Sequence, residues 1–564
     1  MKEINFIYIL LMINGSVIAN GLAADTVRFI GNELLSRPTS SSININLCAE
    51  REIEAYVEYG TEKSMYPNKT SVETLVPKVP FNFLLKNLLP SKKYFYRVIY
   101  RLKGSTEFIS KAEYTFTTQR TKESSFSFAV QADPHLDYNT SSDLLRRSLL
   151  NVLETQNDFL VDLGDNFMSE KENSKSYETT LQRHLLLRGF YDSVCHSIPL
   201  FLVLGNHEGE QGSDLNGTEN CLPVWATKIR KLYYPNPAPD DFYSGNSKDE
   251  MFVGLRENYY SFVWGNALFV VLDPYWYTTE RRGDNWRFTL GDEQYKWFKN
   301  VLENSNTKFK FVFCHQILGG KDSQGRGGSD YARFYEMGGE NADGSWGFTA
   351  YRNGWDLPIH QLMVKNKVNI FFHGHDHFYA KQEKDGIIYQ LVPQPGYPGN
   401  KSTENASDYG YVTGTFLPSS GFLKVTVSDS KVKVDYIKAL LPSMESQSNQ
   451  NGMIVYSYSI PENNFTGMES GLEIPTGFSL EQNYPNPFNP STVIRYELPV
   501  DSFVSFKVFD VSGKEIVTLI NELKPAGIHQ LEFNILNYHL SSGIYFYRIN
   551  TPNFSKTLKM ICLK

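Results

Sequence analysis

The sequence is short of cysteine, of long hydrophobic runs and of net charge, and each shortage excludes a class of protein. Five cysteines in 564 residues are too few for a disulfide-stapled scaffold, and their odd number leaves at least one unpaired. No internal stretch reaches the roughly 18 apolar residues that a membrane-spanning helix needs. The net charge of −7 is mild and argues against a dedicated nucleic-acid binder, which normally presents a basic face.

Three of the cysteines lie near segments rich in polar, chemically versatile residues. Cys195 and Cys221 flank the segment Gly205–His207, so a bridge between them would clamp it in an oxidising compartment, although the sequence alone does not establish the pairing. Cys314 lies inside an apolar run beside His315, and we expect a small buried hydrophobic residue there rather than a ligand.

The N-terminal segment, residues 1–24, has the pattern of a signal peptide. Lys2 precedes an apolar core over residues 6–13, and small residues around Ala19 and Ala23 offer cleavage sites. A simple N-terminal strand is the alternative, because a glutamate weakens the basic front end. We therefore predict an exported protein with no transmembrane segment after cleavage of the signal.

The rest of the chain divides into regions of different periodicity, in keeping with the three or four domains expected for its length. Residues 25–120 alternate short strand patterns with turns and predict a β-sandwich. Residues 123–460 alternate strands with amphipathic helical segments, which indicates a layered α/β domain. Residues 461–477 read as a linker, and residues 478–564 return to strands and turns typical of a second β-sandwich.

Polar residues with metal-binding side chains follow five short apolar runs of the α/β region. The runs are Phe126–Val130, Phe159–Leu163, Pro199–Leu204, Lys310–Cys314 and Val368–Phe372. The residues that follow them are, in order, Asp133 and His135, Asp165, Asn206 and His207, His315, and His375 and His377. Each run is short and rich enough in β-branched or aromatic residues to be a buried strand. Because open α/β sheets bind ligands at the carboxyl ends of their strands, we expect one shared site.

This mixture of carboxylate, amide and imidazole ligands suits a pair of divalent or trivalent metal ions such as Mn, Fe or Zn. Two ions roughly 3.5–4 Å apart activate a water and neutralise the charge of a phosphoryl group, and they need a bridging carboxylate. Asp165 is the natural bridge. The other predicted ligands are Asp133, His135 and His377 for one ion, and Asn206, His315 and His375 for the other.

His207 directly follows a predicted ligand, so its ring can face the substrate without binding metal, and we predict that it is the proton donor. Asp376, Asn166, Glu208 and His373 are interpreted as groups that orient the ligands. Each motif by itself is weak, since a lone Asp-x-His or Gly-Asp pair is usually a turn at the end of a strand. Their joint occurrence, in order and each beside a strand, favours a dinuclear hydrolase.

The ordered set of ligands resembles the calcineurin-like metallophosphoesterase family over about residues 123–400. The resemblance implies a four-layer αββα core. The sandwich ahead of it is similar to fibronectin type III domains, with Tyr94 in the place of the tyrosine corner, and this combination resembles purple acid phosphatases. Those enzymes carry a tyrosine where this chain has Met168 and lack the histidine found here at position 135. The resemblance therefore implies the general phosphoesterase ligand set and not a tyrosinate-coloured iron site.

The C-terminal region resembles the type A sorting domain of the type IX secretion system. The segments Asn483–Thr492 and Ser542–Arg548 carry the match. The resemblance implies an immunoglobulin-like β-sandwich that engages the type IX secretion machinery, so that the protein is secreted or held at the cell surface. The alternative is an ordinary immunoglobulin-like sandwich that binds sugar or protein.

We therefore predict a secreted dinuclear-metal phosphoesterase whose substrate is a phosphate ester, monoester or diester. Two insertions beside the ligands, residues 209–258 and 319–355, are expected to form the walls of the site, with the second deciding the substrate. Arg326, Arg333 and Arg352 of that insertion could hold a phosphate. The rival hypothesis is a catalytically inactive surface adhesin or binding protein, which a metal analysis of the purified protein would exclude.

Overall fold

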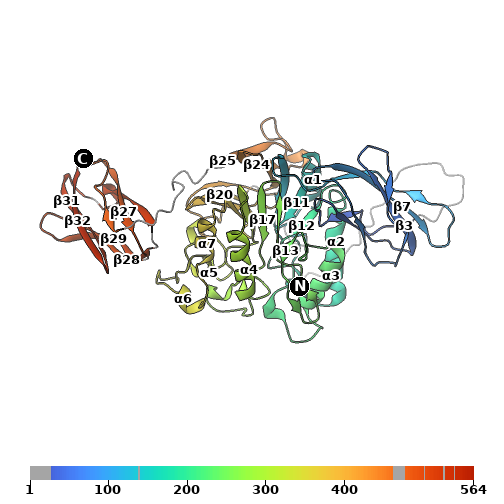
Figure 1. Cartoon of the computed structure of the whole chain (residues 1–564), viewed down its shortest axis with the longest axis horizontal. Coiled ribbons are helices and arrows are strands. Elements are labelled where there is room, and N and C mark those ends of the chain that lie inside the picture. The colour runs from blue at the N-terminus through green and yellow to red at the C-terminus, as the bar shows by residue number, and fades with distance from the viewer. Residues whose placement is uncertain are drawn as a thin grey trace. The chain divides into compact units, whose positions relative to one another are not determined.

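The computed structural model divides the chain into two compact units, residues 1–464 and residues 465–564 (Figure 1). The described residues are 27–136, 140–399, 401–461, 477–500, 502–524, 527–538 and 540–563. The predicted signal peptide and nearly all of the predicted linker lie outside these residues. Among them, no helix combines the length and the apolarity that a membrane crossing requires.

The first unit begins with a β-sandwich. One sheet has the order β1 (Leu34–Ser36), β2 (Ile43–Leu47), β6 (Phe81–Leu85). The other is built on the pairing of β3 (Ile53–Gly60) with β7 (Lys93–Leu102), to which β4 (Asn68–Lys69), β5 (Glu73–Leu75), β8 (Ile109–Ser110) and β9 (Tyr114–Thr117) are added. Alternate residues of these strands are buried and form a core of their own. Tyr94 is the residue in the place of the tyrosine corner. Its hydroxyl accepts a hydrogen bond from the backbone N–H of Leu89, five residues upstream, at 2.9 Å.

Two larger sheets form the centre of the first unit. The six-stranded sheet has the order β12 (Leu200–Leu202), β11 (Phe159–Asp162), β10 (Phe126–Gln131), β23 (Gly421–Val427), β24 (Lys431–Lys438), β25 (Ile454–Pro461). The eight-stranded sheet has the order β13 (Ser244–Gly245), β16 (Tyr260–Trp264), β17 (Ala267–Val271), β18 (Phe309–Phe313), β19 (Ile370–His373), β21 (Ile387–Leu391), β20 (Tyr379–Lys384), β22 (Thr415–Leu417). All five apolar runs predicted as strands are strands.

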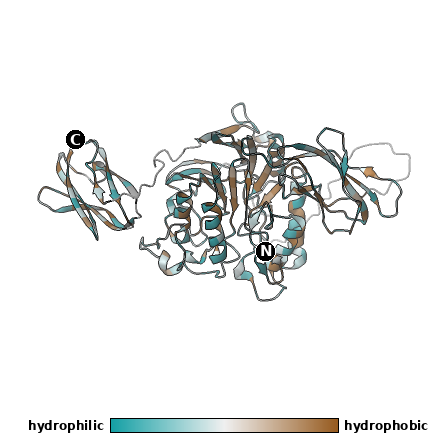
Figure 2. Ribbon diagram, in the orientation of Figure 1, coloured by the Kyte–Doolittle hydropathy of each residue, from teal (hydrophilic) through white to brown (hydrophobic). Residues whose placement is uncertain are grey.

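The two sheets pack face to face through aromatic side chains. Phe128 on β10 contacts Phe269 on β17 edge to face, with ring centroids 5.0 Å apart, and Phe159 on β11 contacts the same ring edge to face at 5.3 Å. These residues belong to one continuous buried core that draws on both sheets. Figure 2 shows the hydrophobic residues concentrated along these strands. Burial on both faces explains why the parallel strands read in the sequence as unbroken apolar runs.

Helices cover the outer face of each sheet (Figure 1). The six-stranded sheet packs against α1 (Ser142–Glu154), α2 (Tyr177–Tyr191) and α3 (Leu222–Tyr233). The eight-stranded sheet packs against α4 (Gly291–Glu303), α5 (Tyr335–Gly338), α6 (Phe348–Tyr351) and α7 (Ile359–Lys365). Helix α1 begins where Ser141 accepts a hydrogen bond from the N–H of Leu144, and its buried face repeats every three to four residues. The predicted α/β class is confirmed.

Buried polar bonds join the N-terminal sandwich to this α/β region. The guanidinium of Arg188, on α2 and 1 % exposed, donates to the carbonyl of Ile30 at 2.8 Å, to Asn46 Oδ1 at 2.7 Å and to the Asn46 carbonyl at 3.1 Å. Tyr96 donates to the carbonyl of His196 at 2.7 Å. The sandwich is therefore an integral part of the first unit.

The second unit is another sandwich with its own core. Its sheets are β26 (Ser479–Leu480), β27 (Ser491–Leu498), β30 (Gly527–Asn534), and β29 (Glu515–Lys524), β28 (Ser502–Phe509), β31 (Gly543–Thr551), β32 (Phe554–Cys562). Val504, Phe506 and Tyr547 are among the fully buried residues between them.

Cys48, Cys195, Cys221 and Cys314 are buried thiols outside any disulfide. Cys195 and Cys221 are both buried and unpaired, so the suggested bridge between them is wrong. Cys195 packs among the apolar residues under α2, whereas Cys221 precedes α3 in a separate cluster with Val224 and Trp276. Cys314 is buried and free as expected, and burial raises the pKa of its thiol far above the usual range.

Candidate metal centre

The predicted ligand residues gather at the carboxyl ends of the parallel strands. Strand β10 leads into Asp133 and His135, β11 into Asp165, β12 into Asn206, β18 into His315, and β19 into His375 and His377. Strands β10, β11 and β12 run parallel in one sheet, and β18 and β19 run parallel in the other. Side chains that follow the two sets of strands meet, so both sets end on the same side of the domain. The two sheets thus bring seven side chains from distant parts of the sequence to one place.

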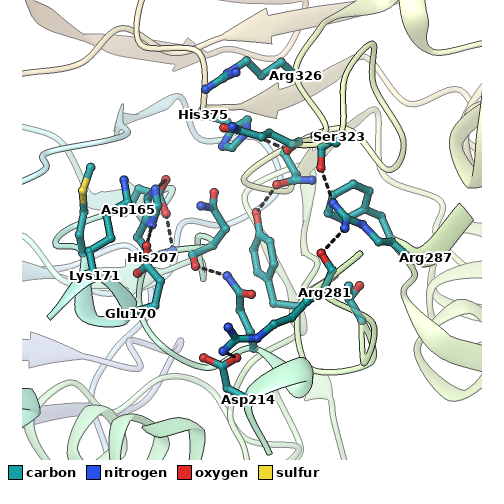
Figure 3. Close-up of a pocket in the computed structure, with 18 of the residues that line it drawn as sticks. Asp165, Glu170, Lys171, His207, Asp214, Arg281, Arg287, Ser323, Arg326 and His375 are labelled. Atoms are coloured by element: carbon teal, nitrogen blue, oxygen red, sulfur yellow. Dashed lines mark hydrogen bonds and ion pairs between the residues drawn. The ribbon is translucent and has the colours of Figure 1, made fainter. Parts of the chain in front are cut away.

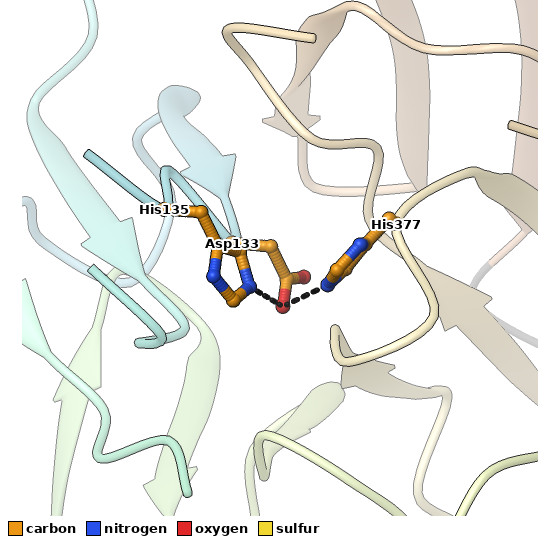
Figure 4. A group of neighbouring side chains, drawn as sticks. All are labelled: Asp133, His135 and His377. Carbon is orange, nitrogen blue, oxygen red and sulfur yellow. Dashed lines mark ion pairs between the residues drawn. The ribbon is translucent and has the colours of Figure 1, made fainter. Parts of the chain in front are cut away.

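Six of these seven residues form two adjacent groups in which all candidate ligand atoms lie within 4.8 Å of one another. The first group is Asp133, His135 and His377, which Figure 4 shows converging on one carboxylate. Asp133 Oδ1 lies 3.7 Å from His135 Nε2 and 3.6 Å from His377 Nε2. These distances leave room for an ion between the three side chains.

The second group is Asp165, His315 and His375. Asp165 Oδ2 lies 2.9 Å from His315 Nε2 and 3.8 Å from His135 Nε2 of the first group. Its carboxylate therefore faces both groups, as a bridging ligand must. Asn206, the seventh predicted residue, lines the cavity that opens over these two groups.

Several atoms of the centre are buried without a hydrogen-bond partner of good geometry. They are both ring nitrogens of His135, Asp165 Oδ2, Asn206 Oδ1 and His315 Nε2. Buried polar atoms in proteins are almost always paired, so a cluster of unpaired ones calls for an explanation. Carboxylate and amide oxygens beside imidazole nitrogens are donors suited to Mn, Fe or Zn, and the set fits a metal site.

The backbone adopts the left-handed conformation at five of the ligand positions. The φ angles are 58° at Asp133, 45° at His135, 55° at Asp165, 78° at His375 and 68° at His377. Asp and His enter this region more readily than bulky or β-branched residues, but it remains unfavourable for any side chain. The tight turns place the side chains directly over the strand ends.

Two glycines of the motifs are required by close approach. A Cβ atom on Gly205 would lie 2.2 Å from Asp165 Oδ1, and a Cβ on Gly374 would lie 2.6 Å from Asp133 Oδ2. Any larger residue at either position would displace a carboxylate of the centre. The sequence patterns Gly205-Asn206 and Gly374-His375 thus reflect packing against the ligands of the neighbouring turns.

Hydrogen bonds fix the orientation of the ligands. Glu208 accepts the backbone N–H groups of Asp165, Asn166 and Gly205 at 3.1, 2.7 and 2.6 Å, as expected for an orienting group. His315 Nδ1 lies 2.8 Å from the carbonyl of Leu163, which fixes the proton on Nδ1 and leaves Nε2 for a metal. Asp376 differs from its prediction, because its carboxylate accepts from Gly327 N–H and Tyr411 O–H and so anchors the insertion rather than a ligand.

The charges of the centre perturb one another strongly. Burial lowers the pKa of His315, but the Asp165 and Asp133 carboxylates outweigh it and raise the pKa to about 10. Burial and then the charge of Asp165 raise the pKa of Glu208 to about 8. A metal ion and a proton compete for the same imidazole nitrogen, so metal binding to such a cluster releases protons.

His207 is held by a residue that the sequence interpretation missed. Its Nδ1 is hydrogen-bonded to Glu170 Oε1, and its Nε2 lies 3.9 Å from Asp165 Oδ2 (Figure 3). Glu170 lies in the short helix η1 (Ser169–Lys171), which follows the Asp165 turn. Its position depends on how that turn folds back over the His207 segment, and a single acidic residue in a loop gives no signal of it.

A cavity of about 810 Å³ opens over the centre. Asp165, Asn206, His207 and three of the ligand histidines line its floor, while Asp133 and His315 lie beneath. The remaining walls are strongly cationic. Six basic residues line them: Lys171, Lys175, Arg281, Arg282, Arg287 and Arg326.

The three arginines predicted to bind phosphate have different positions. Arg326 lines the cavity, but Arg333 pairs with Glu340 at 3.0 Å and Arg352 pairs with Glu336, and neither lines it. The other cavity arginines come from the segment between β17 and α4, which the sequence interpretation did not single out. Insertion 319–355 contributes Ser323, Gln324 and Arg326, and insertion 209–258 contributes Gln211 and Asp214. Lys171 and Lys175 come from the segment between β11 and α2, so the cavity wall is shared among four loops.

Residues 126–379 match the family described as calcineurin-like phosphoesterase, and residues 482–563 match a secretion system C-terminal sorting domain. The second match indicates a protein that is secreted or displayed at the cell surface. No curated protein matches the sequence significantly.

Among solved structures, the fold resembles that of PhoD, with a TM-score of 0.55 and 14 % identity over 77 % of this chain and 90 % of that one. GAP50 of Plasmodium, an anchor in the inner membrane complex, gives a TM-score of 0.32 and 13 % identity over 60 % of this chain and 89 % of its own. A putative 5'-nucleotidase from Staphylococcus aureus gives 0.28 and 14 % over 60 % of this chain and 54 % of its own. At these identities the likeness to PhoD concerns the fold alone.

Proposed function

We propose that this chain, a metal-dependent phosphoesterase with a calcineurin-like phosphoesterase domain over residues 126–379, hydrolyses phosphate esters outside the cell with two metal ions. The observation that carries the proposal is the pair of adjacent ligand groups that share the carboxylate of Asp165. Asp133, His135 and His377 would hold one ion, and Asn206, His315 and His375 the other. A complete ligand set favours an enzyme over the alternative of an inactive adhesin.

The residues of the centre divide the work of hydrolysis among themselves. When bound, the two ions supply an activated water and neutralise charge on the phosphoryl group. Asp165 faces both groups of ligands. His135, His315 and His377 present Nε2 to the carboxylates of the centre. His375 differs, because its Nε2 lies 3.0 Å from the carbonyl of Gln324, which leaves Nδ1 for a metal. An ester that enters the cavity reaches the centre from the side that Asn206 and His207 line.

His207 serves as the proton donor to the leaving oxygen. Glu170 holds Nδ1 and so directs Nε2 toward the centre. Burial lowers the pKa of His207, but the charges of Asp165 and Glu170 raise it above its ordinary value, so the ring can carry a proton at neutral pH. Glu170 is a positioning residue in this scheme, because it acts through His207.

The family match also supports the finer architecture. We propose a four-layer αββα core over residues 123–460, a fibronectin type III-like sandwich over 25–120, a linker over 461–477 and an immunoglobulin-like sorting sandwich over 478–564. A signal peptide over residues 1–24 and the type IX machinery would carry the protein to the outside. The nature of the ester, mono or di, is set by the cavity walls and not by the ligands.

The Asp165→Asn variant tests the proposal. Loss of the bridging charge should abolish hydrolysis of both p-nitrophenyl phosphate and bis(p-nitrophenyl) phosphate and remove most bound metal. Metal content is measured by mass spectrometry after reconstitution with Mn, Fe or Zn. The matched control is Asp429→Asn, since the Asp429 side chain is 64 % exposed and pairs with Lys308. Wild-type metal content in Asp165→Asn contradicts the assignment.

His207→Ala separates the acid from the ligands. This variant should keep its metal while turnover falls by roughly 10²–10⁴-fold, the usual range for a lost general acid. Metal that leaves together with the ring would show instead that His207 is a ligand.

A further inference from the structure

We propose that the natural substrate is a phosphate ester whose alcohol portion carries a second phosphate group, and that Arg281 and Arg282 bind this second group across the cavity from the metal centre. The inference rests on the proposed function, because the metal centre must hold the phosphate that is cleaved. It adds a second point of attachment and names the residues that provide it.

The shape of the cavity provides the first argument. Ligand pockets of proteins usually measure about 300–1,000 Å³, and this one, at about 810 Å³, is far larger than a single phosphate and a small alcohol require. Figure 3 shows Asp165, His207 and Lys171 on one side of the cavity and Arg281 and Arg287 on the other. A substrate whose scissile phosphate lies at the centre therefore extends toward the arginines.

The charge of the lining provides the second argument. Six basic residues face four carboxylates, and two of those carboxylates, Asp165 and Glu170, serve the metal centre and His207. Of the lining carboxylates, Asp214 and Glu280 remain to offset the basic wall, and Asp322 behind it pairs with Arg326. The whole chain carries a net charge of −7, so the accumulation of positive charge at this cavity is local. Such a concave basic surface attracts polyanions and raises their rate of association.

The arginine segment is held in place before a ligand arrives. Arg287 donates through Nη1 to the carbonyl of Arg281 at 2.5 Å and through Nη2 to the carbonyl of Ser323. These bonds tie the segment to the insertion that carries Arg326, whose own Nη1 lies 3.0 Å from Asp322 Oδ2. The wall is preorganised, which reduces the entropy lost on binding.

Arg281 and Arg282 remain available at this wall. Arg281 is anchored by an ion pair with Asp214 but its side chain is still 62 % exposed. Arg282 is exposed and, within the part of the chain that the structure describes, makes no hydrogen bond or ion pair with another residue. Two adjacent guanidinium groups present several N–H donors, which suits the three terminal oxygens of a phosphate better than a single carboxylate or a neutral hydroxyl.

Matched substrate pairs that differ by one phosphate test the inference. The pairs are adenosine 5'-monophosphate with adenosine 3',5'-bisphosphate for a monoesterase, and ApA with pApA for a diesterase. We expect kcat/KM to favour the more phosphorylated member by roughly 10- to 100-fold, the usual value of charge-assisted hydrogen bonds. In the double variant Arg281→Gln/Arg282→Gln this ratio should fall to about one.

Arg333→Gln is the matched control, since Arg333 is exposed on the neighbouring insertion but outside the cavity lining. It should leave the ratio unchanged. A wild-type ratio of one, or a double variant that keeps the wild-type preference while its melting temperature is normal, overturns the inference.

Calorimetric binding of adenosine 3',5'-bisphosphate and adenosine 5'-monophosphate to the metal-loaded protein distinguishes the two proposals. If no ester is hydrolysed, yet the bisphosphate binds more tightly and the double variant abolishes the difference, the second site stands and the proposed function fails. Equal binding of both nucleotides would contradict the second phosphate site, whether or not the protein hydrolyses an ester.

Discussion

The two β-sandwiches that flank the phosphoesterase domain are similar in architecture but differ in how they belong to the chain. The N-terminal sandwich lies in the same compact unit as the phosphoesterase domain, and the C-terminal sandwich forms a unit by itself. Each has a continuous apolar core, so the core does not explain the difference. Buried polar side chains do, because they tie the first sandwich to its neighbour.

Arg188 illustrates the point. Its guanidinium is fully buried and bonds backbone carbonyls and Asn46 of the sandwich from a helix of the α/β region. A buried charge is tolerated only where its donors are satisfied, so both partners must be in place for either to be stable. The sorting sandwich has to meet the opposite requirement, which is stability without its neighbour. A module that is removed or passed to a secretion machine must fold by itself.

Deletion of residues 478–564 is the largest test of this difference. Hydrolysis by the purified protein should be unchanged, while the protein should remain inside the cell envelope, because the sorting match lies wholly in the deleted unit. Fractionation of cells and culture medium measures the second effect. Appearance of the truncated protein outside the cell would refute the export role.

Arg188→Met should destabilise the junction between the N-terminal sandwich and the α/β region of the first unit. Its removal leaves several buried acceptors unsatisfied, and we expect the free energy of unfolding of this unit to fall by about 5 kcal/mol. Urea denaturation followed by tryptophan fluorescence measures it. Arg97→Met is the control, because Arg97 forms a partly exposed pair with Glu58 and should change stability by only about 1 kcal/mol. Similar losses in both variants would contradict the anchoring role.

Phe506→Ala should destabilise the other unit alone. Phe506 is fully buried between the sheets of the sorting sandwich, and truncation of such a side chain costs about 3–5 kcal/mol. Scanning calorimetry should show two transitions, of which only one moves. A concurrent fall in kcat/KM would mean that the two units are coupled.

Glu33→Gln should change stability least among these variants, and it should raise stability where the others lower it. Burial raises the pKa of Glu33 from its ordinary value of 4.5, with Lys111 at 3.5 Å only partly offsetting it. A raised folded pKa stabilises the fold below the unfolded pKa, and this contribution is lost as the pH rises through the folded value. The variant should therefore be the more stable protein at neutral pH, and the difference in melting temperature should vanish toward pH 4.

The sequence predicts which side chains gather at the proposed metal centre because these side chains follow strand ends. Each ligand follows a short apolar run, and parallel strands bring such ends together whatever the loops do. The cavity wall depends on loop packing instead. Arg281 and Arg282 reach the cavity through a segment pinned by Arg287, whereas Arg333, predicted to bind phosphate, turns to Glu340.

Long-range polar contacts could not be predicted from the sequence either. In the sequence, Arg188 looks like a surface residue of a helix, and only the structure shows that the N-terminal sandwich covers it. Glu170 becomes the partner of His207 only because the turn after Asp165 folds over the neighbouring strand end. Neither contact leaves a periodic pattern, which is the signal that sequence interpretation detects.

The left-handed backbone at Asp133, His135, Asp165, His375 and His377 sets the proposed chemistry against the stability of the domain. Each such residue costs about 1 kcal/mol relative to glycine, so the five together cost roughly 5 kcal/mol, a large part of the stability of a typical domain. Glycine at any of these positions should therefore make the domain more stable while it removes a proposed ligand. Stability and hydrolysis thus place opposite demands on the same five residues.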